Sequence, residues 1–310
     1  MSFSVQIKEE ITHKEPTYIE SLCILSSFIR YSATIEDNKI TLNIENPQVA
    51  RFIYKLVKQS FKASPKIIYR QQKKLRAKTI YILEINNNIK PILDTLNIMK
   101  DNKRIIPESY FLQSSEERIA YLKGLFLSCG SLTDPKISGY HLEFVIKDKK
   151  EADHLLEIFE YFKMECKMLK RSNKYMLYIK NSENISSLLK LFETNQALFY
   201  YEDIRIYRDH KNMVNRLNNC EIANQEKVIK TGLIQLELIE YLKEHDLIIL
   251  LDEKIRLVLE YRTRYPEVSY AELSYIIEQE TGTIIGKSGI NHYFIKIKKI
   301  IERHKKINQD

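Results

Sequence analysis

The stretch that decides the fold reads Tyr121-Leu-Lys-Gly-Leu-Phe-Leu-Ser-Cys-Gly-Ser131. Its leucine and phenylalanine residues predict a buried helix. Gly124 within that helix lacks a Cβ atom, so a second backbone could approach closely there. The other interpretation is an ordinary buried helix that happens to contain glycines.

The pattern occurs a second time near the start of the chain. Leu25-Ser-Ser-Phe-Ile-Arg-Tyr-Ser-Ala33 corresponds to the stretch from Leu122 to Gly130, and Ser27 is the small residue opposite Gly124. In both copies the patterning predicts helix, two strands, helix, two strands, helix. The elements after the motif helices are strands ending at 40–44 and 141–146, helices capped by Asn46 and Asp148, hairpins 66–70/79–83 and 167–170/174–179, and helices 89–96 and 185–192. Corresponding elements of the two copies are separated by roughly 100 residues, which indicates a duplicated half-domain and not a short solenoid repeat.

The repeated helix resembles the core motif of the LAGLIDADG homing endonucleases. That resemblance implies paired motif helices, a saddle of strands over DNA, and an acid at the end of each helix that holds the catalytic metal. Here the two acidic positions hold Leu127 and Cys129 in the second copy, and Arg30 and Ser32 in the first. A hard divalent cation needs oxygen ligands, which leucine and cysteine lack. We therefore expect no catalytic residue, no metal site and no enzymatic activity.

One alternative is an active endonuclease with displaced acids. Asp134 or Glu36, near the paired helix ends, would then have to bind the metal ion.

Composition permits a polyanionic partner without identifying one. The 310 residues include 49 Lys and Arg against 41 Asp and Glu, which gives a net charge of +8. No apolar run approaches the ~18 residues of a membrane span, and the N-terminus has no signal-peptide core. The four cysteines are far apart and form no C-x-x-C pair, which argues against a zinc or redox site. We expect a cytoplasmic protein with no membrane partner, no cofactor and no small-molecule substrate.

Two basic segments are candidate secondary DNA-binding surfaces. The first is the hairpin with Arg70, Lys73, Lys74 and Arg76, which could neutralise phosphates or simply protect an edge strand. The second is a connector rich in Asn, Arg and Lys that contains Arg205, Arg208 and Arg216. The other interpretation of the connector, which we prefer, is a capped helix boundary, with an amphipathic helix following from 225 to 245.

The C-terminal part predicts a helix-turn-helix. A helix at 253–262 is followed by a second at about 269–280, where Ser269 and Glu272 fit a capping box, and Thr281-Gly-Thr283 ends it. The last helix, for which Ser288 is the predicted cap, has an apolar stripe of Ile290, Phe294, Ile297 and Ile301. The predicted DNA-binding residues are Lys287, Ser288, Asn291, His292, Tyr293, Lys296, Lys299 and Arg303. The other interpretation is a solvated basic face on a helical subdomain.

The whole chain resembles the WhiA family. The residues that carry the resemblance are Tyr121–Ser131, Asp134-Pro135, Tyr140–Glu143, Val214–Arg216, Asn219–Asn224 with Lys227, and Lys287–His292. Two departures are Cys129, where the family usually has a small residue, and the first motif helix, which ends Ser32-Ala33 without glycine. The resemblance implies a degenerate LAGLIDADG scaffold tethered to a helix-turn-helix domain. It also implies a nucleoid-associated bacterial protein that binds double-stranded DNA in cell division, chromosome segregation or transcription regulation.

We predict an α+β fold in which a duplicated αββαββα LAGLIDADG-like domain (1–200) is joined by a basic connector (201–224) to an all-α helix-turn-helix domain (225–310). The predicted function is DNA binding without nuclease activity, with transcription or division proteins as further candidate partners. Besides the active endonuclease, the remaining alternative is a protein-interaction scaffold that does not bind DNA directly.

Overall fold

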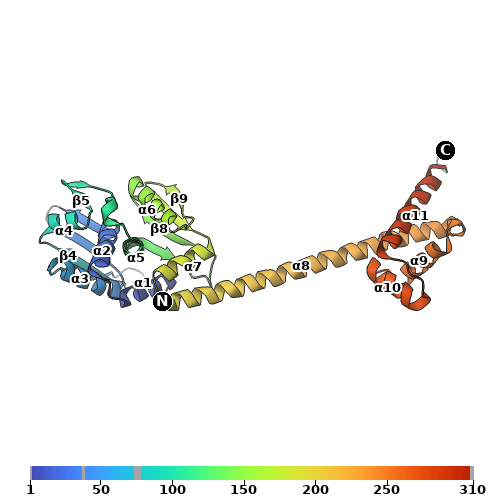
Figure 1. Cartoon of the computed structure of the whole chain (residues 1–310), viewed down its shortest axis with the longest axis horizontal. Helices are drawn as coiled ribbons and strands as arrows, with labels where there is room; N and C mark the ends of the chain where they lie inside the picture. The colour runs from blue at the N-terminus through green and yellow to red at the C-terminus, as the bar shows by residue number, and fades with distance from the viewer. Residues whose placement is uncertain (1, 37–38, 73–77, 308–310) are drawn as a thin grey trace. The chain divides into compact units, whose positions relative to one another are not determined.

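The computed structural model describes residues 2–36, 39–72 and 78–307 (Figure 1). By contacts between residues, the chain divides into two compact units, Met1–Arg208 and Asp209–Asp310. Each unit has its own hydrophobic core. Within the described part of the chain, no helix is long and apolar enough to span a membrane.

The first unit contains the predicted duplication. The first copy is α2 (Tyr18–Ser32), β1 (Ala33–Glu36), β2 (Lys39–Ile44), α3 (Pro47–Phe61), β3 (Lys66–Gln72), β4 (Lys78–Ile85) and α4 (Ile89–Thr95). The second copy is α5 (Ser115–Cys129), β7 (Gly130–Leu132), β8 (Leu142–Ile146), α6 (Lys149–Tyr161), β9 (Lys167–Arg171), β10 (Lys174–Ile179) and α7 (Ser182–Leu191). Each copy forms an antiparallel sheet, in the orders β1-β2-β4-β3 and β7-β8-β10-β9, so the two copies share one topology.

Local sequence signals fix where these elements begin. The side chain of Asn46 accepts the amides of residues 48 and 49 and is followed by Pro47, so α3 starts there. Asp148 caps α6 by accepting the amide of Glu151 at 3.1 Å. The hairpin between β9 and β10 turns at Ser172, whose φ of 54° lies in the left-handed region. The predicted caps and the predicted turn at Ser172-Asn173 are confirmed.

The two motif helices pack against each other with very little separation. A Cβ atom added at Gly124 of α5 would lie 2.1 Å from Ser27 Oγ and 2.3 Å from the carbonyl oxygen of Ile24, both on α2. Both distances are far below van der Waals contact, so only glycine fits. The predicted close approach of α2 and α5 at Gly124 and Ser27 is confirmed.

Several elements of the first unit were not predicted. They are α1 (Phe3–His13), the short hairpin β5 (Met99–Lys100) and β6 (Lys103–Arg104), and the 3-10 turn η1 (Ser109–Phe111). Phe3, Ile7 and Ile11 follow at four-residue spacing and are buried, so α1 belongs to the core. Ser4 on α1 exchanges hydrogen bonds of 2.8 Å with the backbone of Leu132 on β7. The apolar spacing of α1 was present in the sequence, but the charged residues between obscured it.

The second unit contains α8 (Asn195–Glu244) from Asp209 onward, η2 (Leu247–Leu250), α9 (Glu253–Arg264), α10 (Tyr270–Thr281) and α11 (Lys287–Ile307). The capping box of Ser269 and Glu272 is formed, and Gly282, with a φ of 71°, ends α10. The preferred interpretation of a helix boundary within the connector is wrong, because α8 continues without interruption through residues 201–224. The physical reason is that residues 195–231 contain neither glycine nor proline to break the helix.

Candidate nucleic-acid interface

Helix α11 has one buried and one exposed side. Ile290, Phe294, Ile297 and Ile301 are buried in the core of the second unit, as the apolar stripe predicts. Ile295 lies outside the stripe and is exposed. The predicted DNA-binding residues that are exposed are Lys287, Ser288, Asn291, His292, Lys296, Lys299 and Arg303. Tyr293 is half-buried and packs against the core, so it has less freedom than the others to contact a ligand.

The turn before α11 is fixed by hydrogen bonds. Ser274 Oγ donates to the carbonyl of Ile285 at 2.6 Å, which holds α10 to the turn. Helix α11 starts at Lys287, and the amide of Ile290 donates to the carbonyl of Gly286 at 3.1 Å. The prediction that Ser288 caps this helix is therefore wrong. Ser288 lies in the first helical turn, because the segment before it already adopts the helical path from Gly286.

The cationic side chains of α11 differ in whether they form an ion pair within the protein. Lys296 Nζ pairs with Asp252 Oδ2 at 3.0 Å, a contact the sequence did not indicate because the two residues are distant along the chain. Both side chains are largely exposed, so the pair is weak and can open. Lys287, Lys299 and Arg303 have no ion pair with any residue that the structure describes. These three cations are available to an anionic ligand without the loss of an internal contact.

The positions that correspond to the acids of a nuclease hold side chains without a carboxylate. Leu127 is buried, and burial raises the pKa of the Cys129 thiol to about 11, so the sulfur stays protonated. Ser32 Oγ donates to the carbonyl of Phe28 at 2.6 Å. Among the described residues, no group of three His, Cys, Asp or Glu side chains could hold a metal ion.

The side chain of Arg30 is fully buried and serves the structure of the first unit. Its guanidinium pairs with Glu151 at 3.2 Å and donates to the carbonyls of Ile105 and Asn97, each at 2.6 Å. Arg104 Nε also donates to Glu151, at 2.7 Å. This network links α2 to α6, and it occupies the first acidic position of the first motif helix.

The two acids of the endonuclease alternative are both engaged locally. Asp134 Oδ1 accepts the hydroxyl of Tyr200 at 3.1 Å and the amide of Lys136 at 2.8 Å. Glu36 lies 4.0 Å from Lys39 in the same hairpin.

The secondary candidates that the structure describes have different surroundings. Arg70 is exposed on β3, whereas Lys73, Lys74 and Arg76 lie outside the described residues. Arg205 pairs with Glu202 at 2.9 Å, and the guanidinium of Arg208 lies 5.4 Å from the ring of Tyr140. Arg216 is exposed. Arg205 and Arg208 therefore have partners in the first unit, and Arg216 alone of the connector arginines is exposed.

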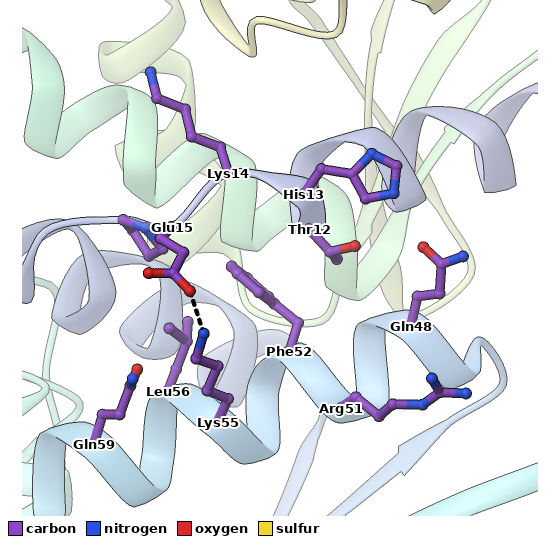
Figure 2. Close-up of a pocket in the computed structure, with 11 residues that line it drawn as sticks. Thr12, His13, Lys14, Glu15, Gln48, Arg51, Phe52, Lys55, Leu56 and Gln59 are labelled. Carbon is purple, nitrogen blue, oxygen red and sulfur yellow. Dashed lines mark hydrogen bonds and ion pairs between the residues drawn. The ribbon is translucent and has the colours of Figure 1, made fainter.

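A hollow in the first unit has mixed charge. It lies between the end of α1 and α3, has a volume of about 480 Å³, and is floored by Phe52 and Leu56 (Figure 2). Lys55 on its rim pairs with Glu15, and that contact lowers the pKa of the Glu15 carboxyl. Lys14 pairs with Glu193 at 2.6 Å. Two of the lysines that line the hollow therefore have carboxylate partners within the protein.

Comparisons with known proteins find matches along both units. The WhiA N-terminal LAGLIDADG-like domain matches residues 20–99, the WhiA LAGLIDADG-like domain matches 118–211, and the WhiA C-terminal HTH domain matches 214–301. The fold is similar to the crystal structure of full-length DUF199/WhiA from Thermatoga maritima, with a TM-score of 0.58 and 24% identity over 98% of this chain and 99% of that one.

Similar relatives are found over the full length of the chain. The probable cell division protein WhiA of Brevibacillus brevis is 35% identical over 309 residues, which cover 98% of this chain and 97% of the relative. The protein of the same name from Bacillus subtilis is 34% identical over 313 residues, with the same two coverages. With this identity along almost the whole of both proteins, the chain belongs to the WhiA family.

Proposed function

We propose that this protein binds double-stranded DNA through α11 and that it acts in cell division. The observation that carries the proposal is the exposed cationic side of α11, where Lys287, Lys299 and Arg303 have no ion pair with a described residue, in a helix-turn-helix whose turn is fixed by Ser274. The relatives' description as probable cell division proteins supports the second part. Roles in chromosome segregation and transcription regulation, and association with the nucleoid in the cytoplasm, belong to the same proposal.

The chemistry of α11 suggests two kinds of DNA contact. Asn291 is exposed near the helix start, where an amide can form a bidentate contact with an adenine edge. Lys299 and Arg303 lie further along the helix and suit backbone phosphates, which give affinity without sequence information. Lys287 and His292 flank Asn291 and add positive or polar groups at the start of the helix.

We further propose that the LAGLIDADG-like unit does not cut DNA. The side chains at the four acidic positions support this, since they are a buried leucine, a protonated thiol, a buried arginine and a serine bonded to the backbone, and none of them is a carboxylate. Supercoiled plasmid incubated with the protein and Mg²⁺ or Mn²⁺ should remain intact. Nicking that survives repurification and disappears in Asp134→Ala would refute this proposal and favour the displaced-acid alternative.

The DNA-binding proposal is tested by salt-dependent affinity measurements on the full chain. Replacing Lys299 by Ala should weaken binding to all duplexes alike and lower the slope of log K against log salt by about 1. Lys296→Ala should have a smaller effect, because Lys296 must first leave Asp252. Asn291→Ala should cost roughly 1–3 kcal/mol on a preferred site and little elsewhere.

The control is a hairpin variant in which Arg70, Lys73, Lys74 and Arg76 are replaced together. A larger loss of affinity in this variant than in Lys296→Ala/Lys299→Ala would move the main DNA site to the first unit. Absence of binding even at low salt would instead favour a protein-interaction scaffold.

A further inference from the structure

Just after the connector, α8 borders a hollow in the second unit, and of the residues that line it the proposed function uses only Lys287. Lys227 and Thr231 of α8, Ser269 and Tyr270 at the start of α10, and Lys287 at the start of α11 line it. Its volume is about 210 Å³, below the ~300–1,000 Å³ typical of small-molecule pockets. A phosphate group on the surface of a larger ligand is a better match for this size than an enclosed metabolite.

The charges around this hollow have one sign. Lys227, Lys287 and Arg262 are among its lining residues, and no carboxylate is. Each of the other hollows described in this structure includes at least one glutamate in its lining. Two lysines far apart in sequence therefore line the same small volume without a counter-ion among the residues that the structure describes, which favours an external anion.

One buried and one half-buried polar side chain, Arg262 and Tyr270, line the hollow. Arg262 is 1% exposed, and its Nη1 donates to three backbone carbonyls, the nearest being that of Val268 at 2.6 Å. Its Nε is buried and has no hydrogen-bond partner among the described residues. Tyr270 lies under this guanidinium at 5.7 Å and stacks on Phe294 of α11. A guanidinium with one unpartnered nitrogen is thus held in place at the same hollow as the two lysines.

The position of α8 at this site is fixed. A Cβ atom at Gly232 would lie 2.0 Å from the carbonyl oxygen of Pro266, so α8 contacts the loop before α10 directly. One turn further, Gln235 donates a hydrogen bond to the hydroxyl of Tyr270. Because these contacts lie just after Lys227, they hold Lys227 next to α10 and α11.

The start of α10 adds backbone donors to the site. The amide of Glu272 is capped by Ser269 Oγ, and the Glu272 carboxylate accepts the amide of Ser269 at 2.7 Å. The amides of Tyr270 and Ala271 have no acceptor among the described residues. Unpaired amides at a helix start favour an anion, and here they accompany the lysines and the arginine.

The part of α8 that precedes Lys227 carries exposed polar side chains of the kind that contact DNA. Every residue from 209 to 227 is exposed, although the segment is helical throughout. Arg216, Asn219, Ala223 and Lys227 follow at three- and four-residue spacing, so they lie on one side of α8. That side carries the cationic side chains of Arg216 and Lys227 and the amide of Asn219.

We propose that a backbone phosphate of the bound DNA sits in this hollow, between Lys227 and Lys287. The connector helix is then part of the DNA-binding surface and not only a covalent link. This inference rests on the proposed DNA binding, and it adds a second helix, α8, to the contact made by α11.

The test uses the full chain and a duplex selected by the unmodified protein. Lys227→Ala should weaken binding and lower the slope of log K against log salt by about 1, since one phosphate contact is lost. Lys227→Arg should restore most of the affinity. The matched control is Lys211→Ala, which removes the same charge from an exposed position of α8 that does not line the hollow. Equal slopes for Lys227→Ala and Lys211→Ala would overturn the proposal.

A scan with single uncharged methylphosphonate linkages locates the phosphate. At one position in the duplex, the methylphosphonate should weaken binding of the unmodified protein. The same replacement should leave the affinity of Lys227→Ala unchanged. Failure of the two proposals is distinguishable, because the unmodified protein would show no DNA affinity if the proposed function were wrong. The last measurement is the melting temperature of both proteins in inorganic phosphate at constant ionic strength. If phosphate raised the melting temperature of the unmodified protein but not of Lys227→Ala, and no linkage showed the expected effect, the hollow would bind free phosphate and the proposal would be wrong.

Discussion

Replacing Gly124 by alanine should destabilise the first unit, although alanine is the better helix former. The added Cβ would lie 2.3 Å from the carbonyl oxygen of Ile24, whereas a carbon and a carbonyl oxygen in contact are about 3.3 Å apart. The helices α2 and α5 would therefore have to separate by about 1 Å along most of their contact. Overpacking of this kind costs about 1–3 kcal/mol, and helix propensity returns about 1 kcal/mol.

We expect the upper end of the overpacking range, about 3 kcal/mol, because a backbone carbonyl cannot rotate away from the new methyl group, so the net loss is about 2 kcal/mol. For a unit of this size the melting temperature should fall by about 4–8 °C. Differential scanning calorimetry of the full chain measures this, and only the transition of the first unit should move. Ser27→Gly in the same chain should recover only part of the loss, since it removes the contact at Ser27 Oγ and leaves the one at Ile24.

Gly139→Ala is the control, because nothing lies within 4 Å of a Cβ atom at Gly139. It should leave the melting temperature almost unchanged. A rise in melting temperature for Gly124→Ala would show that helix propensity outweighs the contact, and the reasoning about the paired helices would be refuted.

Three further outcomes are expected. Arg30→Met should reduce the free energy of unfolding by about 3 kcal/mol, measured in urea, because Glu151 stays buried with a single remaining cation. Burial lowers the pKa of His154 from 6.5 to about 4, so the unfolded chain takes up a proton in this pH window before the folded chain does. Stability should therefore fall as the pH drops through that window, by at most about 1.4 kcal/mol per pH unit, and His154→Phe should flatten this dependence. Expressed separately, residues 1–208 and 209–310 should each unfold cooperatively by circular dichroism, and a fragment without a transition would show that its core depends on the other unit.

Local signals in the sequence were enough for most of the element order. The caps at Asn46 and Asp148 and the apolar stripe from Ile290 to Ile301 each depend on neighbours within one or two helical turns. The duplication of the first unit was visible because both copies repeat the same order of such signals. Local signals also predicted the two helices α10 and α11 and most of the exposed side of α11, although Ser288 does not cap α11 and Tyr293 is half-buried.

Contacts between distant residues were decided by the tertiary structure. The sequence showed charged residues at Arg30 and Glu151, but only the packing of α2 near α6 makes them a buried pair. In the same way, Lys227 and Lys287 meet at one hollow because Gly232 allows α8 to approach the loop before α10. The course of α8 through the connector was also missed, since an exposed helix has no apolar stripe to reveal its period. Sequence periodicity reports which side of an element is buried, whereas the partner that buries it, or that shares a site with it, is set by packing across the chain.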